Sequence, residues 1–138
     1  MNNLISLMKE ADGFLCLQPA DTSSIQNAEN MLRTQFAEDY RQYLLAFGAA
    51  SFDGKELTGI CNSERLSVVS ATERARRLYP RFPENAYVIE DLSFDHIFII
   101  QDKSGAICSY GPADTSEKIA ESLQAYLFPD SKLSLQAK

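Results

Sequence analysis

The side chains that would reveal an enzyme are few in this chain. Its single histidine, His96, is the one residue suited to act as the base of a triad hydrolase, and such a base needs a nucleophile and an orienting acid beside it. The chain contains neither a Gly-x-Ser-x-Gly nor a His-Glu-x-x-His segment. We therefore interpret His96 as a structural or surface residue, and we expect no catalytic residue and no enzymatic activity.

A phosphate-binding loop is suggested by Gly54-Lys55 and then rejected. That motif requires Gly, four residues and Gly-Lys-Ser/Thr, whereas five residues separate Gly48 from Gly54 and Glu56 replaces the hydroxyl residue. The segment also leads into a predicted strand, so no helix N-terminus would meet a phosphate. We expect no nucleotide site.

Metal and redox chemistry are equally poorly supported. Glu90, Asp91 and Asp95 lie close in sequence and Asp102 follows one strand later, and such oxygen ligands could bind calcium. The chain nevertheless has no glycine-turned loop of alternating ligands. Two readings of these acids stay open, a solvated rim and a recognition patch for a basic protein, and we expect no metal and no cofactor.

The three cysteines suggest no redox or zinc motif either, because no Cys-x-x-Cys occurs. Each has apolar neighbours, which predicts three small buried residues. They are Cys16, Cys61 and Cys108.

Acidic side chains in the middle of the chain form the candidate partner-binding surface. The segments that carry them enter or leave a predicted sheet, so we expect the side chains to converge. Aromatic residues could anchor a partner at the centre, and Phe94 or Tyr87 could serve if exposed. The predicted surface comprises Glu84, Glu90, Asp91, Phe94, Asp95 and Asp102.

A second candidate surface is a local cluster of arginines on and beyond a predicted helix. It reads either as a polar helix face or as a site for phosphate or an acidic partner. On a helix, Arg74 and Arg77 share a face and Arg76 points away. Arg81 follows beyond the predicted end of the helix.

The composition favours a protein partner. The chain has 138 residues and a formal net charge of −6, which disfavours nucleic acid and membranes and favours basic partners. No apolar run approaches the roughly 18 residues that span a bilayer, and charged residues stand where a signal peptide would be apolar. We expect a cytoplasmic protein that is a monomer or weak homodimer.

The hydrophobic pattern predicts helices first, then strands, then a closing helix. Apolar residues at helical spacing predict helices over 2–12, 24–35, 38–47, 70–79 and 116–128, the second and fourth opened by capping boxes at Ser23 and Ser70. Extended segments are predicted over 56–60, 66–69, 86–89, 96–101 and 106–110. Residues 130–138 are expected to form a loose tail.

This order indicates an α+β fold in one domain over 1–138, with an antiparallel sheet of four to six strands and helices packed mainly on one face. The unbroken apolar run Ile97-Phe98-Ile99-Ile100 predicts a central strand paired with 106–110. The predicted core contains Tyr40, Leu44, Phe47, Phe98, Ile100, Leu123 and Leu127.

Four segments in this order resemble the SUKH superfamily. They are an acidic-Tyr-basic helix start over 36–45, a sheet-entry segment over 79–91, an Asp-x-x-Gly hairpin over 98–107 and a Leu-rich end over 122–127. The resemblance covers about 24–128. Ala37 stands where the family usually has proline, and Phe47-Gly48-Ala49 stands where an Asn-Gly-Gly type of turn is common.

The resemblance implies a binding scaffold to which no catalytic residues belong. Bacterial members are commonly immunity proteins that bind and block a cognate toxin domain, often a nuclease, and other members are regulatory interaction proteins. The expected function is therefore toxin neutralisation by protein–protein interaction, with a regulatory or scaffold role as the alternative. Neither the toxin nor the position of the interface follows from the sequence.

Overall fold

The computed structural model describes residues 3–92 and 94–129, which form five helices and seven strands. The helices are α1 (Asn3–Lys9), α2 (Thr22–Leu32), α3 (Glu38–Phe47), α4 (Val68–Leu78) and α5 (Leu123–Leu127). The strands are β1 (Leu15–Cys16), β2 (Ala50–Phe52), β3 (Lys55–Glu56), β4 (Ala86–Asp91), β5 (Phe98–Asp102), β6 (Ile107–Gly111) and β7 (Thr115–Ala120).

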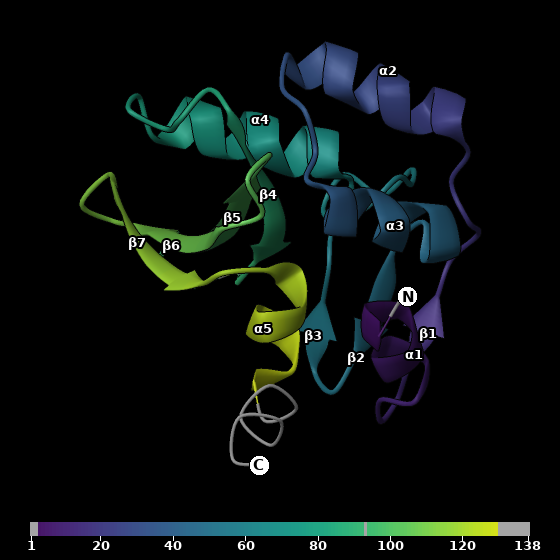
Figure 1. Ribbon diagram of the computed structural model, residues 1–138. Helices are drawn as coiled ribbons and strands as arrows, with labels where there is room; N and C mark the ends of the chain where they lie inside the picture. Colours follow the sequence, from purple (N-terminus) through teal and green to yellow (C-terminus); the bar gives the residue numbers. More distant parts are fainter. Residues whose placement is uncertain (1–2, 93, 130–138) are drawn as a thin grey trace.

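The strands form two antiparallel sheets. A small sheet has the order β1-β2-β3, and a larger meander has the order β4-β5-β6-β7. Figure 1 shows α3 between α2 and the small sheet, and α4 running beside β4 and β5. The prediction of an α+β fold with a four-stranded antiparallel sheet is confirmed.

Strand β5 is internal, as its apolar run predicts. It pairs with β4 on one side and β6 on the other, and Ile100 lies opposite Cys108 of β6. Its side chains alternate between two clusters: Ile99 joins the larger core, whereas Phe98 and Ile100 join the smaller one. The strand is therefore buried on both faces, which explains why its sequence does not alternate.

Helices cover the two faces of the larger sheet unequally. Residues of α1, α2, α3 and α5 all contribute to the larger core, and α4 supplies Ala71 and Ala75 to the smaller core on the opposite face. All seven residues predicted for the core are buried. Within the described residues, no helix is long and apolar enough to cross a membrane.

Buried polar groups fasten α3 to β4 through Thr58. The Thr58 hydroxyl donates to the Val88 carbonyl (2.8 Å) and therefore accepts the hydroxyl hydrogen of Tyr40 (2.8 Å). Tyr43 donates to the Thr58 carbonyl (2.7 Å). The tyrosines of α3 thus bury their rings and still satisfy their hydroxyl groups, which an unpaired burial would not allow.

The predicted closing helix over 116–128 is wrong in its first half. Residues Thr115–Ala120 pair with β6 as the edge strand β7, and the helix α5 begins only after Ser122, whose hydroxyl caps it by accepting from Ala125 N (3.1 Å). Pairing with a neighbouring strand overrides the helical spacing of Ile119 and Leu123, because a short apolar pattern does not distinguish a helix from an exposed edge strand.

Two predicted helix starts are displaced by other caps. Asp21 accepts from Ser24 N (2.8 Å), so α2 begins at Thr22 and not at a Ser23 cap. The hydroxyl of Ser67 accepts from Ser70 N (3.3 Å), so α4 begins at Val68, and the extended segment predicted over 66–69 is wrong. At each helix start, two nearby side chains are both suited to cap the helix, and the local sequence does not show which of them does so.

Three further expectations need correction. Of the strand predicted over 56–60, only Glu56 belongs to a strand, β3. The helix predicted over 2–12 ends earlier, at Lys9 of α1. None of the three cysteines is buried: Cys16 is exposed and the other two are half-buried. The loose tail predicted over 130–138 lies outside the described residues.

Candidate functional site

The predicted acidic surface is divided between the two ends of one strand pair. Asp102 lies opposite Ala86, just after the exposed Glu84, whereas Asp91 lies opposite Phe98 at the other end of β4. Five residue steps separate the ends, or about 16 Å. The expectation that these side chains converge is therefore wrong. The structure brings Asp91, Phe94 and Asp95 together, and it leaves Glu84 and Asp102 apart from them.

Glu90 is not on the surface at all. Its side chain is 7% exposed, and its Oε1 accepts the hydroxyl hydrogen of Tyr126 in α5 at 2.6 Å. Burial raises the pKa of the Glu90 carboxyl, and the hydrogen bond from Tyr126 opposes this shift in part. In this position Glu90 cannot meet a partner, and it holds α5 against the sheet.

A β-bulge explains why the neighbouring side chains of Glu90 and Asp91 lie on opposite faces of the sheet. The register of β4 against β5 shifts between Val88 and Glu90, and such an extra residue re-aims the side chains that follow. Val88 and Asp91 both face α4 although they are three positions apart, and Glu90 faces α5. Without the bulge, Glu90 would share the α4 face with Val88.

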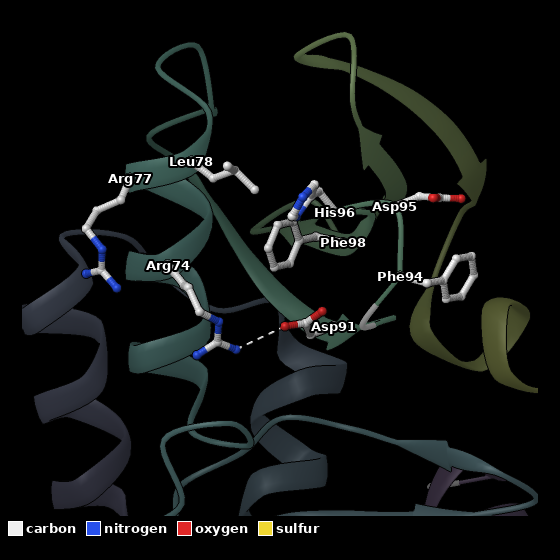
Figure 2. A pocket seen from close by; sticks show the side chains of 8 residues that line it. All are labelled: Arg74, Arg77, Leu78, Asp91, Phe94, Asp95, His96 and Phe98. Atoms are coloured by element: carbon white, nitrogen blue, oxygen red, sulfur yellow. Dashed lines mark hydrogen bonds and ion pairs between the residues drawn. The ribbon is translucent and has the colours of Figure 1, made fainter.

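Asp91 is held by α4. Its Oδ2 accepts from Nη2 of Arg74 at 3.1 Å, and Nη1 of the same guanidinium donates to the Glu64 carbonyl at 3.2 Å. Figure 2 shows Arg74 reaching across from the helix to Asp91. This carboxylate is thus engaged within the protein, and Arg74 is engaged with it.

A tight turn presents Phe94 to solvent. Ile97 N donates to the Phe94 carbonyl at 3.2 Å, and the two central residues, Asp95 and His96, both have positive φ (53° and 56°). This is the pattern of a type I′ turn, for which Asn-Gly is the favoured pair. A histidine in the left-handed region costs about 1–2 kcal/mol. The turn leaves Phe94 58% exposed.

An open pocket of about 540 Å³ lies between this turn and α4. Its apolar part includes Leu78 and Phe98, and Figure 2 shows the ring of His96 next to Phe98. In the same view Arg77 stands on the helix side, and Phe94 and Asp95 extend on the opposite side. The pocket therefore joins the acidic candidate surface to the arginine cluster, which the sequence had presented as alternatives.

The arginine cluster is mostly occupied with holding the fold. Arg76 donates to the carbonyls of Leu32 (2.8 Å) and Glu84 (3.2 Å), away from the pocket. Arg77 is exposed, and no hydrogen bond or ion pair involves its side chain anywhere in residues 3–92 and 94–129. Arg74 and Arg77 share a face and Arg76 points elsewhere, as predicted.

Of two other sequence candidates, one is excluded by its burial and the other is engaged within its own turn. Tyr87 is fully buried, donates to Gln101 Oε1 (2.7 Å) and accepts from Ala37 N (2.8 Å), so it is not a surface anchor. Asp102 is half-buried and accepts from Ser104 N (2.9 Å) within its own turn. Across the described part of the chain, no three His, Cys, Asp or Glu side chains are grouped to hold a metal ion.

Sequence reasoning missed the residues that complete the pocket. Phe98 was predicted for the core and Leu78 was not singled out, and nothing in their sequence context indicates that α4 and β5 leave an opening between them. The turn was also missed, because Asp-His lacks the Asn-Gly signal of a tight hairpin turn.

Comparison with protein families identifies the scaffold. The family model described as SMI1-KNR4 cell-wall (SUKH_5) matches residues 1–129. The chain belongs to the SUKH_5 family. The match extends at both ends beyond the segment over 24–128 in which the resemblance was seen, and it includes the pocket and the turn. No curated protein matches the sequence.

Membership indicates what proteins of this family generally do. SUKH domains are generally non-catalytic binding domains, and SUKH proteins are commonly immunity proteins. The pocket of this SUKH_5 domain suits such a role, since it combines exposed apolar side chains with a few charged groups at its margin.

Proposed function

We propose that this SUKH_5 domain is an immunity protein that binds and neutralises a cognate bacterial toxin domain of the nuclease type. The observation that carries the proposal is the exposed Phe94 on a strained turn beside an open pocket. A large aromatic side chain held out by a short hairpin loses little conformational freedom on binding, so it is suited to anchor a partner. Backbone strain of this kind concentrates at functional sites.

Charge supports a basic partner. The net charge of −6 attracts a basic domain over long range and speeds encounter more than it tightens the final complex. Asp95 is the acidic residue of the predicted set that lies exposed beside Phe94. Glu84 and Asp102, at the other end of the β4–β5 pair, would add to the long-range attraction but would not contact the partner beside Phe94.

A regulatory or scaffold role is the second candidate. The observation that favours it is the description of the matching family, which names the cell-wall proteins SMI1 and KNR4. On this alternative the same surface would bind a cellular protein and no toxin.

The proposal includes several expectations about the whole protein. It acts as one domain in the cytoplasm, as a monomer or weak homodimer, without cofactor, nucleic acid or membrane, and it has no enzymatic activity of its own. Purified protein should therefore not hydrolyse nucleotides, esters, peptides or nucleic acids. Reproducible turnover that disappears in a His96→Ala variant would overturn the non-enzymatic assignment.

Co-expression tests the function directly. The genes beside this one are searched for a toxin domain, and a domain found there is expressed from an inducible promoter, with or without the SUKH_5 protein. The proposal predicts that cells survive only when the SUKH_5 protein is present. Equal death in both cultures contradicts it, and a neighbourhood without any toxin gene favours the regulatory alternative.

A further inference from the structure

The small sheet ends in an apolar strand whose outer edge is open. Strand β1 lies on the side of that sheet away from the larger sheet (Figure 1). Leu15 in this strand and Leu17 just after it are 69% and 51% exposed. Edge strands usually carry a charge or a proline that prevents pairing with another chain. Here Pro19 comes only after the leucines, so the unprotected edge is short.

Cys16 leaves its backbone groups free at this edge. Leu15 lies opposite Ser51 of β2, and Leu17 N donates to the Ala49 carbonyl at 2.9 Å. Alternate residues of an antiparallel strand bond to the same neighbour, so the N–H and C=O of Cys16 point away from β2. Within the described part of the chain, neither group has a partner. An added strand would therefore find one donor and one acceptor at Cys16.

A small apolar hollow accompanies the edge. It has a volume of about 190 Å³, and its lining includes Leu15, Leu17 and Leu66. Glu56 also lines it, and Oε1 of this residue accepts from Nη1 of Arg65 at 2.5 Å. Because these two charges are paired with each other, the margin of the hollow has no net charge.

The lack of charge at this edge decides which partner fits it. No residue from Gly13 to Ala20 is charged. A basic partner is attracted to acidic groups elsewhere on the protein, and nothing at β1 would select it. Two copies of a protein with a net charge of −6 repel each other, so they meet best where neither presents net charge. The edge therefore suits a second copy of this chain better than it suits a charged partner.

We infer that β1 pairs antiparallel with β1 of a second copy of this chain, around a two-fold axis at Cys16. Each Cys16 N–H then donates to the Cys16 carbonyl of the other copy, and Leu15 lies opposite Leu17 of the other copy. An axis perpendicular to the sheet keeps all four leucines on one face, where they form a continuous apolar stripe. The pairing consumes both open edges, so it ends at a dimer. The inference does not depend on the proposed toxin, which contacts the separate surface at Phe94.

The dimer should be weak. Pairing of about three residues from each copy is far smaller than the surface of roughly 1,200 Å² or more that stable complexes bury. We therefore expect a dissociation constant between about 10 µM and 1 mM. An equilibrium in this range leaves the protein monomeric when it is dilute and dimeric where it accumulates.

Paired substitutions at the two leucines test the register. Sedimentation velocity of the full chain between about 10 µM and 1 mM should show a dimer that grows with concentration. Leu15→Lys/Leu17→Lys places lysines opposite each other and should weaken the dimer about tenfold or more. Leu15→Lys/Leu17→Glu places each lysine opposite a glutamate and should restore most of the dimer. Ile119→Lys, on the edge strand β7, is the control and should dimerise like the wild type.

Cross-linking locates the axis without any change at the leucines. Directly opposed residues that exchange hydrogen bonds have Cα atoms about 5.5 Å apart, so a short bis-methanethiosulfonate reagent should join the two Cys16 thiols. Cys16 is exposed, and Cys61→Ser/Cys108→Ser leaves it as the one thiol of the chain. The covalent dimer should form in this variant and should be absent once Cys16→Ser is added.

A wild type that remains monomeric at the highest concentration overturns the inference. A dimer that persists in Leu15→Lys/Leu17→Lys, or that cannot be joined through Cys16, overturns it as well. The outcome is separable from the proposed function, because Phe94→Ala should leave the dimer unchanged. A chain that dimerises at β1 but fails to protect cells refutes the toxin proposal alone, and a protective monomer refutes this inference alone.

Discussion

The hydroxyl of Tyr126 donates a hydrogen bond of 2.6 Å to Oε1 of the buried Glu90 and so joins helix α5 to the bulged strand β4. The ammonium of Lys55, in β3 of the small sheet, lies 5.9 Å from the centre of the Tyr126 ring. The hydrogen bond with Tyr126 keeps the Glu90 carboxylate away from the surface. The bulge directs the next acidic side chain, Asp91, to Arg74. Because Glu90 and Asp91 bind partners inside the protein, the acidic side chain that remains exposed near the turn is that of Asp95, beside the exposed Phe94.

The Glu90 contact predicts a pH dependence of stability. Burial raises the pKa of Glu90 above its ordinary value of 4.5, so the folded protein holds this proton more tightly than the unfolded chain. Its stabilising contribution is complete below pH 4.5 and is lost as the pH rises through the raised pKa. Urea unfolding of Glu90→Gln should show a smaller loss of stability between these pH values than the wild type. Identical slopes would show that Glu90 does not titrate differently in the folded state.

Docking of α5 is tested by Leu123→Ala. Leu123 is fully buried in the larger core, and removing such a side chain should cost about 2–5 kcal/mol of unfolding free energy. Ile119→Ala, on the exposed edge strand β7, is the matched control and should cost much less, because Ile119 is 45% exposed. Equal effects in denaturant titrations would place α5 outside the core.

Much of the fold follows from the sequence, and the site follows only in part. The continuous apolar run of β5 predicted its central position, and helix α3 was predicted with its observed bounds because Gly48 ends a clear apolar stripe. Strand β7 was missed since its partner β6 decides its conformation. Glu90 was wrongly assigned to the surface with Asp91 because the bulge that changes the facing of both residues has no signature in the sequence. Of the two aromatic residues proposed as anchors on condition that they are exposed, Phe94 meets the condition and Tyr87 does not, and the pocket beside Phe94 arises from tertiary packing.

Strain in the turn predicts a stabilising substitution. His96 has a φ of 56°, and glycine adopts this conformation without steric cost. After the larger entropy of the unfolded glycine chain is subtracted, His96→Gly should raise the unfolding free energy by roughly 0.5–1 kcal/mol. His96→Ala keeps the Cβ atom and should give no such gain. A destabilised glycine variant in thermal melts would mean that the imidazole makes a compensating contact.

Electrostatic steering predicts an effect on association rate. Asp95→Asn should slow association with the toxin domain and reduce its dependence on salt, and the melting temperature should stay nearly unchanged. Glu117→Gln removes the same charge from an exposed position on the edge strand β7, which is separated from β5 by β6, and serves as control. Stopped-flow kinetics over a range of ionic strength measures the association rate and its dependence on salt. Equal rates for the two variants would mean that only the net charge matters and that Asp95 is outside the contact.

The most direct test of the proposed role of the turn is the affinity of the Phe94→Ala variant for a catalytically inactivated form of the proposed toxin partner. Isothermal titration should show one-to-one binding of the wild type. Removal of a central aromatic anchor should weaken binding by about 2–4 kcal/mol, or roughly 30- to 1,000-fold. Ile119→Ala, which truncates another exposed apolar side chain on β7 (45% exposed, against 58% for Phe94), should bind as tightly as the wild type. If Phe94→Ala and the wild type bind with the same affinity, the turn does not anchor the partner and the account of this surface is wrong.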